Sequence, residues 1–338
     1  MNTPPTEAEI TAVYPKLQRL SEELNGLLYG QERLIESVIT GMVANGHLLL
    51  EGLPGLGKTE LVKGLARAIG LETRRIQFTP DLLPGDITGS PILQETGGVR
   101  EFVFQPGPLF ANLVLADEIN RASPKTQSAL LEAMQERRVT VMGETHPLPS
   151  PFFVIATQNP IELEGTYPLP EAQLDRFLFK LDVPEAGVEV LERIVSGREM
   201  GVEPMVEPAL SGGELAAASA LARRVYLPPV VANYIARLVA ATRPGAGEAA
   251  AGVKFGASPR AALGLAAAAR ARALLEGRPN TSFEDVAAVA PPVLGHRVIL
   301  DYTARLTGQT SAAVVARVLE QTPFQDHATP ATLVSMPQ

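Results

Sequence analysis

The sequence predicts an α/β domain built on a parallel sheet, followed by a small all-α domain. In the first half of the chain, short apolar runs alternate with helical patterns, which is typical of βαβ units. After about residue 184 the composition shifts, and from Gly213 onward the chain is rich in Ala and helix-start signals. We find no internal repeat. A length of 338 residues also suits about two domains.

The expected strands are short apolar runs, and helical patterns lie between them. Ser123 before Pro124 is a favourable helix start, because the hydroxyl can cap the helix and proline suits its first position. The expected strands are 47–50, 74–78, 113–116, 152–156 and 177–181, and the expected helices between them are 31–44, 58–69 and 124–137.

Two segments interrupt this alternation, and each is predicted to form a hairpin. Within the Gly- and Pro-rich segment 81–108, residues 92–94 and 99–104 alternate like paired strands around Thr96-Gly97-Gly98. The second candidate pairs 139–142 with 145–148 across a turn at Gly143-Glu144.

The second half is predicted to be helical. Ser258-Pro259 and Ser282 are start signals of the same kind as Ser123-Pro124. The Gly/Ala/Pro run 243–252 is expected to be a loop without a buried pattern, and the last dozen residues to be frayed. The expected helices are 214–226, 230–242, 259–275, 283–290 and 310–320.

The composition excludes several classes of function. With 29 Lys+Arg against 37 Asp+Glu, the net charge is −8 and the pI near 5.2, which argues against a protein that coats nucleic acid by charge. The absence of Cys rules out disulfides, iron–sulfur clusters and Cys-based zinc sites. No apolar run approaches the roughly 20 residues of a membrane span, and the N-terminus lacks a secretory signal. A cytoplasmic location is the default expectation. The four His are scattered, at His47, His146, His296 and His327.

The strongest motif is the G-x-x-x-x-G-K-T loop at 52–59, which lies between an expected strand and an expected helix. Its glycines let backbone N–H groups curl around phosphate oxygens, and the helix that follows adds its positive end. Lys58 can then reach the β- and γ-phosphates, and the Thr59 hydroxyl can bind Mg²⁺. The loop predicts a site for a nucleoside triphosphate with Mg²⁺.

Polar side chains end two of the other expected strands. Asp117 and Glu118 follow the apolar run 113–116, at the edge of the sheet where ligands of open α/β sheets bind. We expect Asp117 to hold the Mg²⁺ hydration shell and Glu118 to deprotonate the attacking water. Asn159 ends the next strand, and could bind that water or the γ-phosphate, or simply form an Asn-Pro turn.

Two arginines are further candidates. Arg176 precedes the last expected strand and could act as an arginine finger on a neighbouring subunit's nucleotide, since its planar fork suits phosphate. The alternative is a salt bridge within the chain, to Asp175 or Glu171. Arg260 begins a helix of the second domain and could contact the γ-phosphate, or be an ordinary solvated helix residue.

In this order, these elements resemble the AAA+ ATPases, and the segment from Ala116 to Glu136, ADEINRASPKTQSALLEAMQE, is similar to the MoxR family in particular. The resemblance extends from about residue 20 to 325. One departure is Tyr29, where an aliphatic residue usually stands. The further matching segments are Tyr29–Glu32, Ala156–Pro160, Leu169–Phe177, Gly256–Arg260 and His296-Arg297.

The resemblance implies a parallel five-stranded core, an α-helical lid and ATP bound between them. It makes 81–108 the helix-2 insertion and 139–148 the pre-sensor hairpin, both facing the pore of a ring that is usually hexameric. Arg260 would then serve its own subunit or a neighbour. The implied domains are a tail or helix at 1–20, the core at 21–184, the lid at 185–325 and a tail at 326–338. The implied ATP contacts are Gly30, Gln31, Gly52, Pro54, Gly55, Leu56, Gly57, Lys58, Thr59 and Glu60.

The function implied is ATP hydrolysis that drives a chaperone-like remodeller. Relatives commonly act with proteins that carry a von Willebrand factor A domain, in protein maturation or metal-cofactor insertion. Two alternatives stay open. A nucleic-acid motor would use Arg137 and Arg138 at the base of the second hairpin, although the acidic balance weakens this reading. A nucleotide-gated scaffold would hydrolyse little ATP, although Glu118 and Arg176 are both present.

Overall fold

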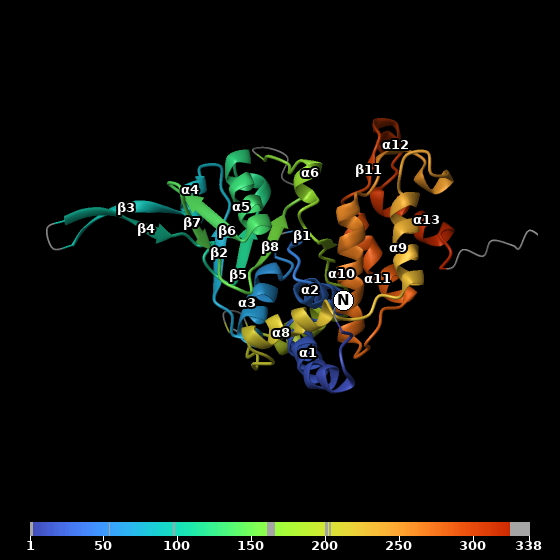
Figure 1. Cartoon of the computed structure of the whole chain (residues 1–338), viewed down its shortest axis with the longest axis horizontal. Coiled ribbons are helices and arrows are strands. Elements are labelled where there is room, and N and C mark those ends of the chain that lie inside the picture. Colours follow the sequence, from blue (N-terminus) through green and yellow to red (C-terminus); the bar gives the residue numbers. More distant parts are fainter. Residues whose placement is uncertain are drawn as a thin grey trace, which may run out of the picture.

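The structure is a computed structural model, and it describes residues 3–53, 55–96, 99–160, 166–199, 202 and 204–324. Figure 1 shows a sheet domain beside a helical domain, with α1 (Glu7–Leu27), α3 (Lys58–Ile69) and α8 (Gly212–Ala222) below the sheet. A long hairpin of β3 (Gly89–Thr96) and β4 (Val99–Pro106) extends away from both domains (Figure 1).

Five parallel strands form the central sheet in the order β2-β5-β8-β1-β9. Each overlaps one of the predicted apolar runs, so the expected parallel α/β core is confirmed. The strand order places β1, which leads into the G-x-x-x-x-G-K-T loop, between β8 and β9. The strands are β1 (Leu48–Glu51), β2 (Thr73–Gln77), β5 (Leu113–Asp117), β8 (Phe153–Gln158) and β9 (Phe179–Asp182).

Helices cover both faces of this sheet. Because alternate residues of a strand point to opposite faces, neighbouring residues of one strand pack into different apolar clusters. Leu48 and Leu50 pack into the apolar cluster that includes α1, α2 and α3, whereas Leu49 packs into the cluster that includes α5. Thr6 caps α1, which runs across residue 20 without a break. Ser123 caps α5, as the sequence predicts. The other helices of this domain are α2 (Glu32–Val43), α4 (Pro84–Thr88), the 3-10 turn η1 (Ile119–Arg121), α5 (Pro124–Glu136) and α6 (Glu171–Leu174).

Both predicted hairpins form, with bounds that differ from the expectation. The first extends from Gly89 to Pro106 and is longer than the alternating residues indicated. The second pairs β6 (Arg138–Val141) with β7 (Glu144–Pro147), and its turn lies at Met142 and Gly143, one residue earlier than expected. The two turn residues have φ of 50° and 84°, the conformation that two-residue hairpins favour because it matches strand twist.

The second domain is helical, as predicted, with one short addition. The strands β10 (Val253–Phe255) and β11 (Ile299–Leu300) pair antiparallel, and η2 (Glu248–Ala250) precedes them. Ala249 and Ala250 are buried, so the expectation that 243–252 carries no buried residues is wrong. The helices are α7 (Val188–Gly197), α8, α9 (Pro229–Ala241), α10 (Pro259–Leu275), α11 (Phe283–Leu294), α12 (Tyr302–Leu306) and α13 (Ser311–Gln321).

The two domains share one apolar cluster, which runs from α2 and β9 into α10 and α11. Small residues on α10 allow this approach: a Cβ on Gly264 would lie 3.2 Å from Leu178 Cδ1, close to the start of β9. α11 continues past its expected end through Pro291 and Pro292 to Leu294. None of the helices in the described part of the chain is both long and apolar enough to span a bilayer.

Candidate nucleotide site

The G-x-x-x-x-G-K-T loop connects β1 to α3 at the carboxyl end of the sheet. Gly55 and Gly57 both have φ of 84°, a left-handed conformation that a side chain would strain. A Cβ on Gly57 would also lie 2.9 Å from Leu28 Cδ2. The glycines therefore permit a tight turn directly before Lys58, the first residue of α3. Gly52 and Leu56 lie in the same turn, and Pro54, an expected ATP contact, lies outside the described residues.

The Lys58 ammonium lies over this loop, and Nζ donates a hydrogen bond to the Gly52 carbonyl at 2.6 Å. Burial lowers the pKa of Lys58, while the carboxylates of Asp117 and Glu118 oppose that shift. A partly buried ammonium bound to a single carbonyl has donors left for phosphate oxygens. The position fits the phosphate-binding role predicted for Lys58.

A cavity of about 340 Å³ opens between this loop and the ends of the strands. It brings together the sequence-predicted residues Lys58, Thr59, Asp117, Glu118 and Asn159. Thr59 and Asp117 offer a hydroxyl and a carboxylate oxygen, the donor set that Mg²⁺ uses together with waters and phosphate oxygens. The residues present therefore fit Mg²⁺. The rest of the lining is Gly55, Gly57, Glu60, Arg75 and Gln77.

Asp117 is held by two neighbours that the sequence analysis did not identify. The buried Thr157 hydroxyl donates to Asp117 Oδ1 at 2.6 Å. The Arg75 guanidinium donates to the other oxygen, Oδ2, also at 2.6 Å. Arg75 therefore lies where a cation beside Asp117 would bind. The polar residues Arg75 and Gln77 alternate along β2 opposite the end of β5, which is a period-2 signal for this shared face.

Glu118 has a left-handed backbone, with φ of 56° and ψ of 50°. Such a conformation costs a non-glycine residue about 1–2 kcal/mol and aims the side chain at the cavity. Thr157 Oγ1 accepts the Glu118 N–H at 2.9 Å, which stabilises the turn. The carboxylate accepts from Gln77 Nε2 at 2.8 Å and from Arg121 at 2.9 Å. Glu118 is thus fixed at the cavity wall.

Asn159 follows the last residue of β8 and is buried at the cavity. Its carbonyl accepts a hydrogen bond from Asn120 Nδ2 at 3.4 Å, which joins the two loops that follow β5 and β8. Asn159 lines the same cavity as Glu118, which is compatible with its predicted role.

A second, larger cavity of about 810 Å³ adjoins the loop on the side of Tyr29 and Gln31. Gln31 Nε2 donates to the Leu56 carbonyl at 3.2 Å. A Cβ on Gly30 would meet Val190 of α7 at 2.5 Å, so only glycine fits there. The Tyr29 ring lies under the Arg193 guanidinium at 4.5 Å, a contact that the usual aliphatic residue could not make.

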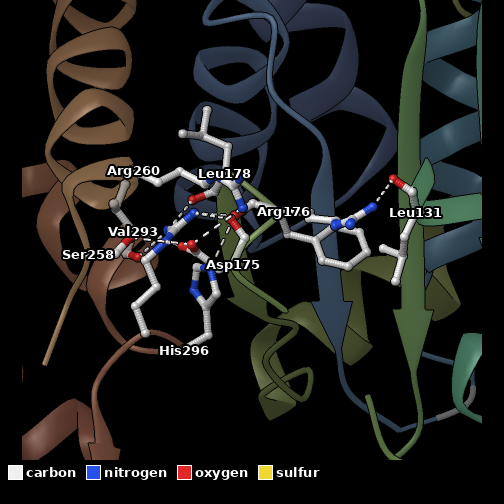
Figure 2. Close-up of polar contacts among 10 residues, drawn as sticks. Leu131, Asp175, Arg176, Leu178, Ser258, Arg260, Val293 and His296 are labelled. Carbon is white, nitrogen blue, oxygen red and sulfur yellow. Dashed lines mark hydrogen bonds and ion pairs between the residues drawn. The ribbon is translucent and has the colours of Figure 1, made fainter. Parts of the chain in front are cut away.

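The 340 Å³ cavity lined by Lys58 and Asp117 is called the phosphate cavity from here on. Arg176 lies apart from the phosphate cavity of its own chain. Its guanidinium donates to the Leu131 carbonyl of α5 at 2.8 Å, and the residue lines a separate cavity along that helix. Figure 2 shows the side chain extending from the chain beside Asp175 toward Leu131. No ion pair between Arg176 and Asp175 or Glu171 is present in the described part of the chain, where Asp175 pairs with Arg260 and Arg297 instead.

Arg260 also lies outside the phosphate cavity. It donates to Asp175 Oδ2 at 3.5 Å and is half-exposed at the start of α10. The Ser258 hydroxyl, expected to cap α10, contacts the same carboxylate oxygen at 3.3 Å rather than a helix N–H. Both residues face the carboxylate of Asp175, the residue directly before Arg176 (Figure 2).

A parallel α/β sheet, a glycine-rich phosphate loop and an acidic strand end beside a helical domain together define a P-loop nucleotide-binding protein with a lid. The sequence model of the "ATPase family associated with various cellular activities (AAA)" matches residues 47–179, and that of the "AAA lid domain" matches residues 246–318. The chain belongs to the MoxR family of AAA+ ATPases.

The relatives that establish this membership match along most of their length. Chaperone MoxR1 of Mycobacterium tuberculosis is 46% identical, over 94% of this chain and 85% of its own. Protein MoxR of Methylorubrum extorquens is 33% identical, over 89% and 93%. The crystal structure of a candidate ATPase from Cytophaga hutchinsonii superposes with a TM-score of 0.86 at 39% identity, over 95% of this chain and 98% of that one.

Proposed function

We propose that this protein is a ring-forming, Mg²⁺-dependent ATPase that uses hydrolysis to remodel a partner protein. The observation that carries the proposal is the convergence of Lys58, Thr59, Asp117, Glu118 and Asn159 on one cavity at the carboxyl edge of the sheet. These residues come from three separate segments, namely the start of α3, the end of β5 with the turn after it, and the loop after β8. Their side-chain chemistry matches phosphate binding, metal binding and proton transfer in turn.

The proposed reaction divides these roles among the residues. The loop amides and Lys58 would bind the phosphates, and Thr59 and Asp117 would hold Mg²⁺, which neutralises charge on the β- and γ-phosphate oxygens when bound. Glu118 would accept a proton from the attacking water, which Asn159 would orient. Gln77 and Arg121 both donate to the Glu118 carboxylate, so it would have to leave these donors, at least in part, to accept the proton of the water.

The position of Arg176 supports an action between subunits. The residue lies outside its own phosphate cavity and lines a different surface, next to the exposed Glu132 and Glu136 of α5. We propose that it reaches the γ-phosphate of a neighbouring copy in a ring, most simply a hexamer. Arginine fingers of this kind raise rates by about 10³–10⁵-fold. Hydrolysis would then require assembly.

The remodelling role rests on two further points. A relative that covers most of this chain is named a chaperone, and the β3–β4 hairpin projects far from the domain that carries the cavity (Figure 1). The hairpin exposes Leu93 and Phe102, apolar side chains suited to gripping a protein client. We propose a partner with a von Willebrand factor A domain and a client that matures with its help, through metal-cofactor insertion or refolding.

The Glu118→Gln variant tests the ATPase proposal. The amide keeps the shape of the side chain but cannot accept the proton, so we expect ATP affinity within about twofold of wild type and turnover at least about 100-fold slower. Gel filtration with ATP should reveal a long-lived ring. Wild-type turnover by this variant would remove Glu118 from the mechanism, and a nucleotide-gated scaffold predicts no difference between the two proteins.

Affinity capture with the ATP-loaded Glu118→Gln protein tests the partner. Recovery of a von Willebrand factor A protein supports the remodeller. Salt-sensitive DNA binding with DNA-stimulated ATPase activity would favour a nucleic-acid motor instead. The contacts of the two hairpin arginines oppose that alternative, since Arg137 donates to Asn45 and Arg138 to Glu136.

A further inference from the structure

We propose that Arg297 is a positioning residue for Arg176, and that it ties the lid to the segment that carries the finger. Arg297 belongs to the His296-Arg297 pair, which the proposed mechanism leaves without a role. The inference rests on the proposed action of Arg176 between subunits. In this view the lid holds the residues on either side of Arg176, the arginine that its own subunit presents to the next.

All five N–H groups of the Arg297 side chain have acceptors. Nε donates to Asp175 Oδ1 at 2.6 Å, and one terminal nitrogen donates to the carbonyls of Asp175 and Phe177 at 3.1 and 2.6 Å. The other terminal nitrogen donates to the Leu178 carbonyl at 3.1 Å and to Val293. Four of the five bonds thus reach the segment 175–178, which contains Arg176.

The environment of Arg297 explains why these bonds are needed. The side chain is 3% exposed, and a buried guanidinium is tolerated only when it is paired and its donors are satisfied. Burial lowers the pKa of Arg297, and the bonded Asp175 carboxylate opposes that shift. The planar fork fits several carbonyls at once, which a lysine ammonium cannot do.

Other lid residues hold the same segment. His296 Nε2 contacts the Phe177 carbonyl at 3.1 Å, and burial lowers the pKa of His296 to about 3, so the ring is neutral and donates through this nitrogen. Ser258 and Arg260 reach the second Asp175 oxygen. Lid residues therefore bind both the Asp175 carboxylate and the backbone carbonyls on either side of Arg176.

The Arg176 side chain points away from these lid contacts. It extends to the Leu131 carbonyl on α5, while Asp175 faces the lid residues Ser258, Arg260 and His296 (Figure 2). The backbone of Arg176 is therefore fixed from one side and its guanidinium from the other. A displacement of the lid would move the Asp175–Leu178 backbone and, with it, the finger.

Mixed rings test this assignment. An Arg176→Ala subunit keeps an intact cavity but supplies no finger, and a Lys58→Ala subunit supplies a finger but binds no ATP, so their mixture should recover activity. We then place Arg297→Lys in one partner at a time. With Arg297→Lys in the Lys58→Ala subunit, we expect recovered kcat to fall at least about tenfold, since a 1 Å misplacement of a catalytic group can cost about 100-fold.

The reverse placement separates positioning from folding. With Arg297→Lys in the Arg176→Ala subunit, we expect recovered activity and ATP affinity within about twofold of the reference mixture. That subunit contributes only its nucleotide cavity and has no Arg176 side chain to position. Arg270→Lys is the matched control, since this lid arginine donates to Val225 within the lid. It should leave both mixtures unchanged. Asp175→Asn, which keeps the shape of the acceptor, should repeat the asymmetry if Arg297→Lys fails to fold.

Equal loss in both placements, or no loss in either, would overturn the positioning role of Arg297. A loss confined to the Arg176→Ala partner would do the same. If the reference mixture of Lys58→Ala and Arg176→Ala shows no recovery at any ratio, the finger itself does not act between subunits. The proposed function then fails at that point, and the role of Arg297 fails with it.

Discussion

At the scale of single residues, the geometry of the site depends on Thr157, a buried residue that is not part of the cavity lining. Thr157 is fully buried and serves both acidic residues, donating to the Asp117 carboxylate and accepting the Glu118 N–H. One hydroxyl thus fixes the carboxylate that we propose to bind Mg²⁺ and a strained backbone turn. Arg75 adds a cation on the other Asp117 oxygen, so the acidic strand end is balanced before any metal binds.

We predict that Thr157→Val lowers kcat at least about tenfold. The substitution keeps the shape but leaves Asp117 Oδ1 and the Glu118 N–H without their buried partner, at a cost of about 1–3 kcal/mol. Mg²⁺ titration of ATP binding and steady-state hydrolysis measure the two effects. Thr157→Ser, which restores the hydroxyl, should recover most of the activity. Equal activities for the Val and Ser variants would contradict the role of the hydroxyl.

At the scale of elements, the long hairpin is attached to the sheet domain through two closely packed glycines. Gly89 has φ of 94°, and a Cβ there would lie 2.3 Å from the Gln105 carbonyl oxygen. A Cβ on Gly107 would lie 2.4 Å from the Gly89 nitrogen. Near the end of β4, the Phe104 ring stacks on the His146 ring of β7 with 3.9 Å between the ring centroids, and this contact joins the two hairpins.

We predict that Gly89→Ala loosens the hairpin while ATP binding is retained. The new methyl group would clash with backbone atoms, which cannot move aside as a flexible side chain can, and the positive φ adds strain. Hydrogen exchange along β3 and β4 should rise, while β1 stays protected. Gly85→Ala is the control, because nothing lies within 4 Å of a Cβ there. The same exchange in both variants would refute this account of the hairpin base.

At the scale of the whole molecule, two buried histidines join separate parts of the fold. His47, beside β1, accepts the Val154 N–H of β8 and contacts the Met134 carbonyl of α5. His296 joins the lid to the start of β9 through the Phe177 carbonyl. Burial lowers the pKa of His47 to about 4 and that of His296 to about 3. Both rings are therefore neutral in the folded protein at pH 7.

These pKa values predict acid sensitivity. Unfolded histidines titrate near 6.5, so between pH 6.5 and about 3 the unfolded chain binds more protons and stability falls as the pH falls. The full contribution is present above pH 6.5. We predict that His296→Gln loses about 2 kcal/mol less stability than wild type between pH 6.5 and 4.5, measured by urea unfolding. Parallel pH curves for the two proteins would contradict this prediction.

Local pattern alone determined much of the fold and of the phosphate-binding part of the site. The apolar runs, the glycine spacing of the loop and the cap before Pro124 report short-range chemistry, and the structure has the corresponding strands, turn and helix. The acidic pair Asp117-Glu118 was recognisable because it ends an apolar run that follows the glycine-rich loop in the sequence. Apart from that order along the chain, these signals lie within a few residues of the atoms concerned.

Only the tertiary structure decided which distant residues share a contact. Strand order places Thr157 against Asp117, across 40 positions of sequence, and the lid packing places Arg297 against Asp175, across 122. Arg176 turned toward α5 rather than to Asp175, since the lid arginines occupy that carboxylate. Such pairings depend on how elements pack, and no local pattern encodes that, because each partner alone reads as an ordinary polar residue.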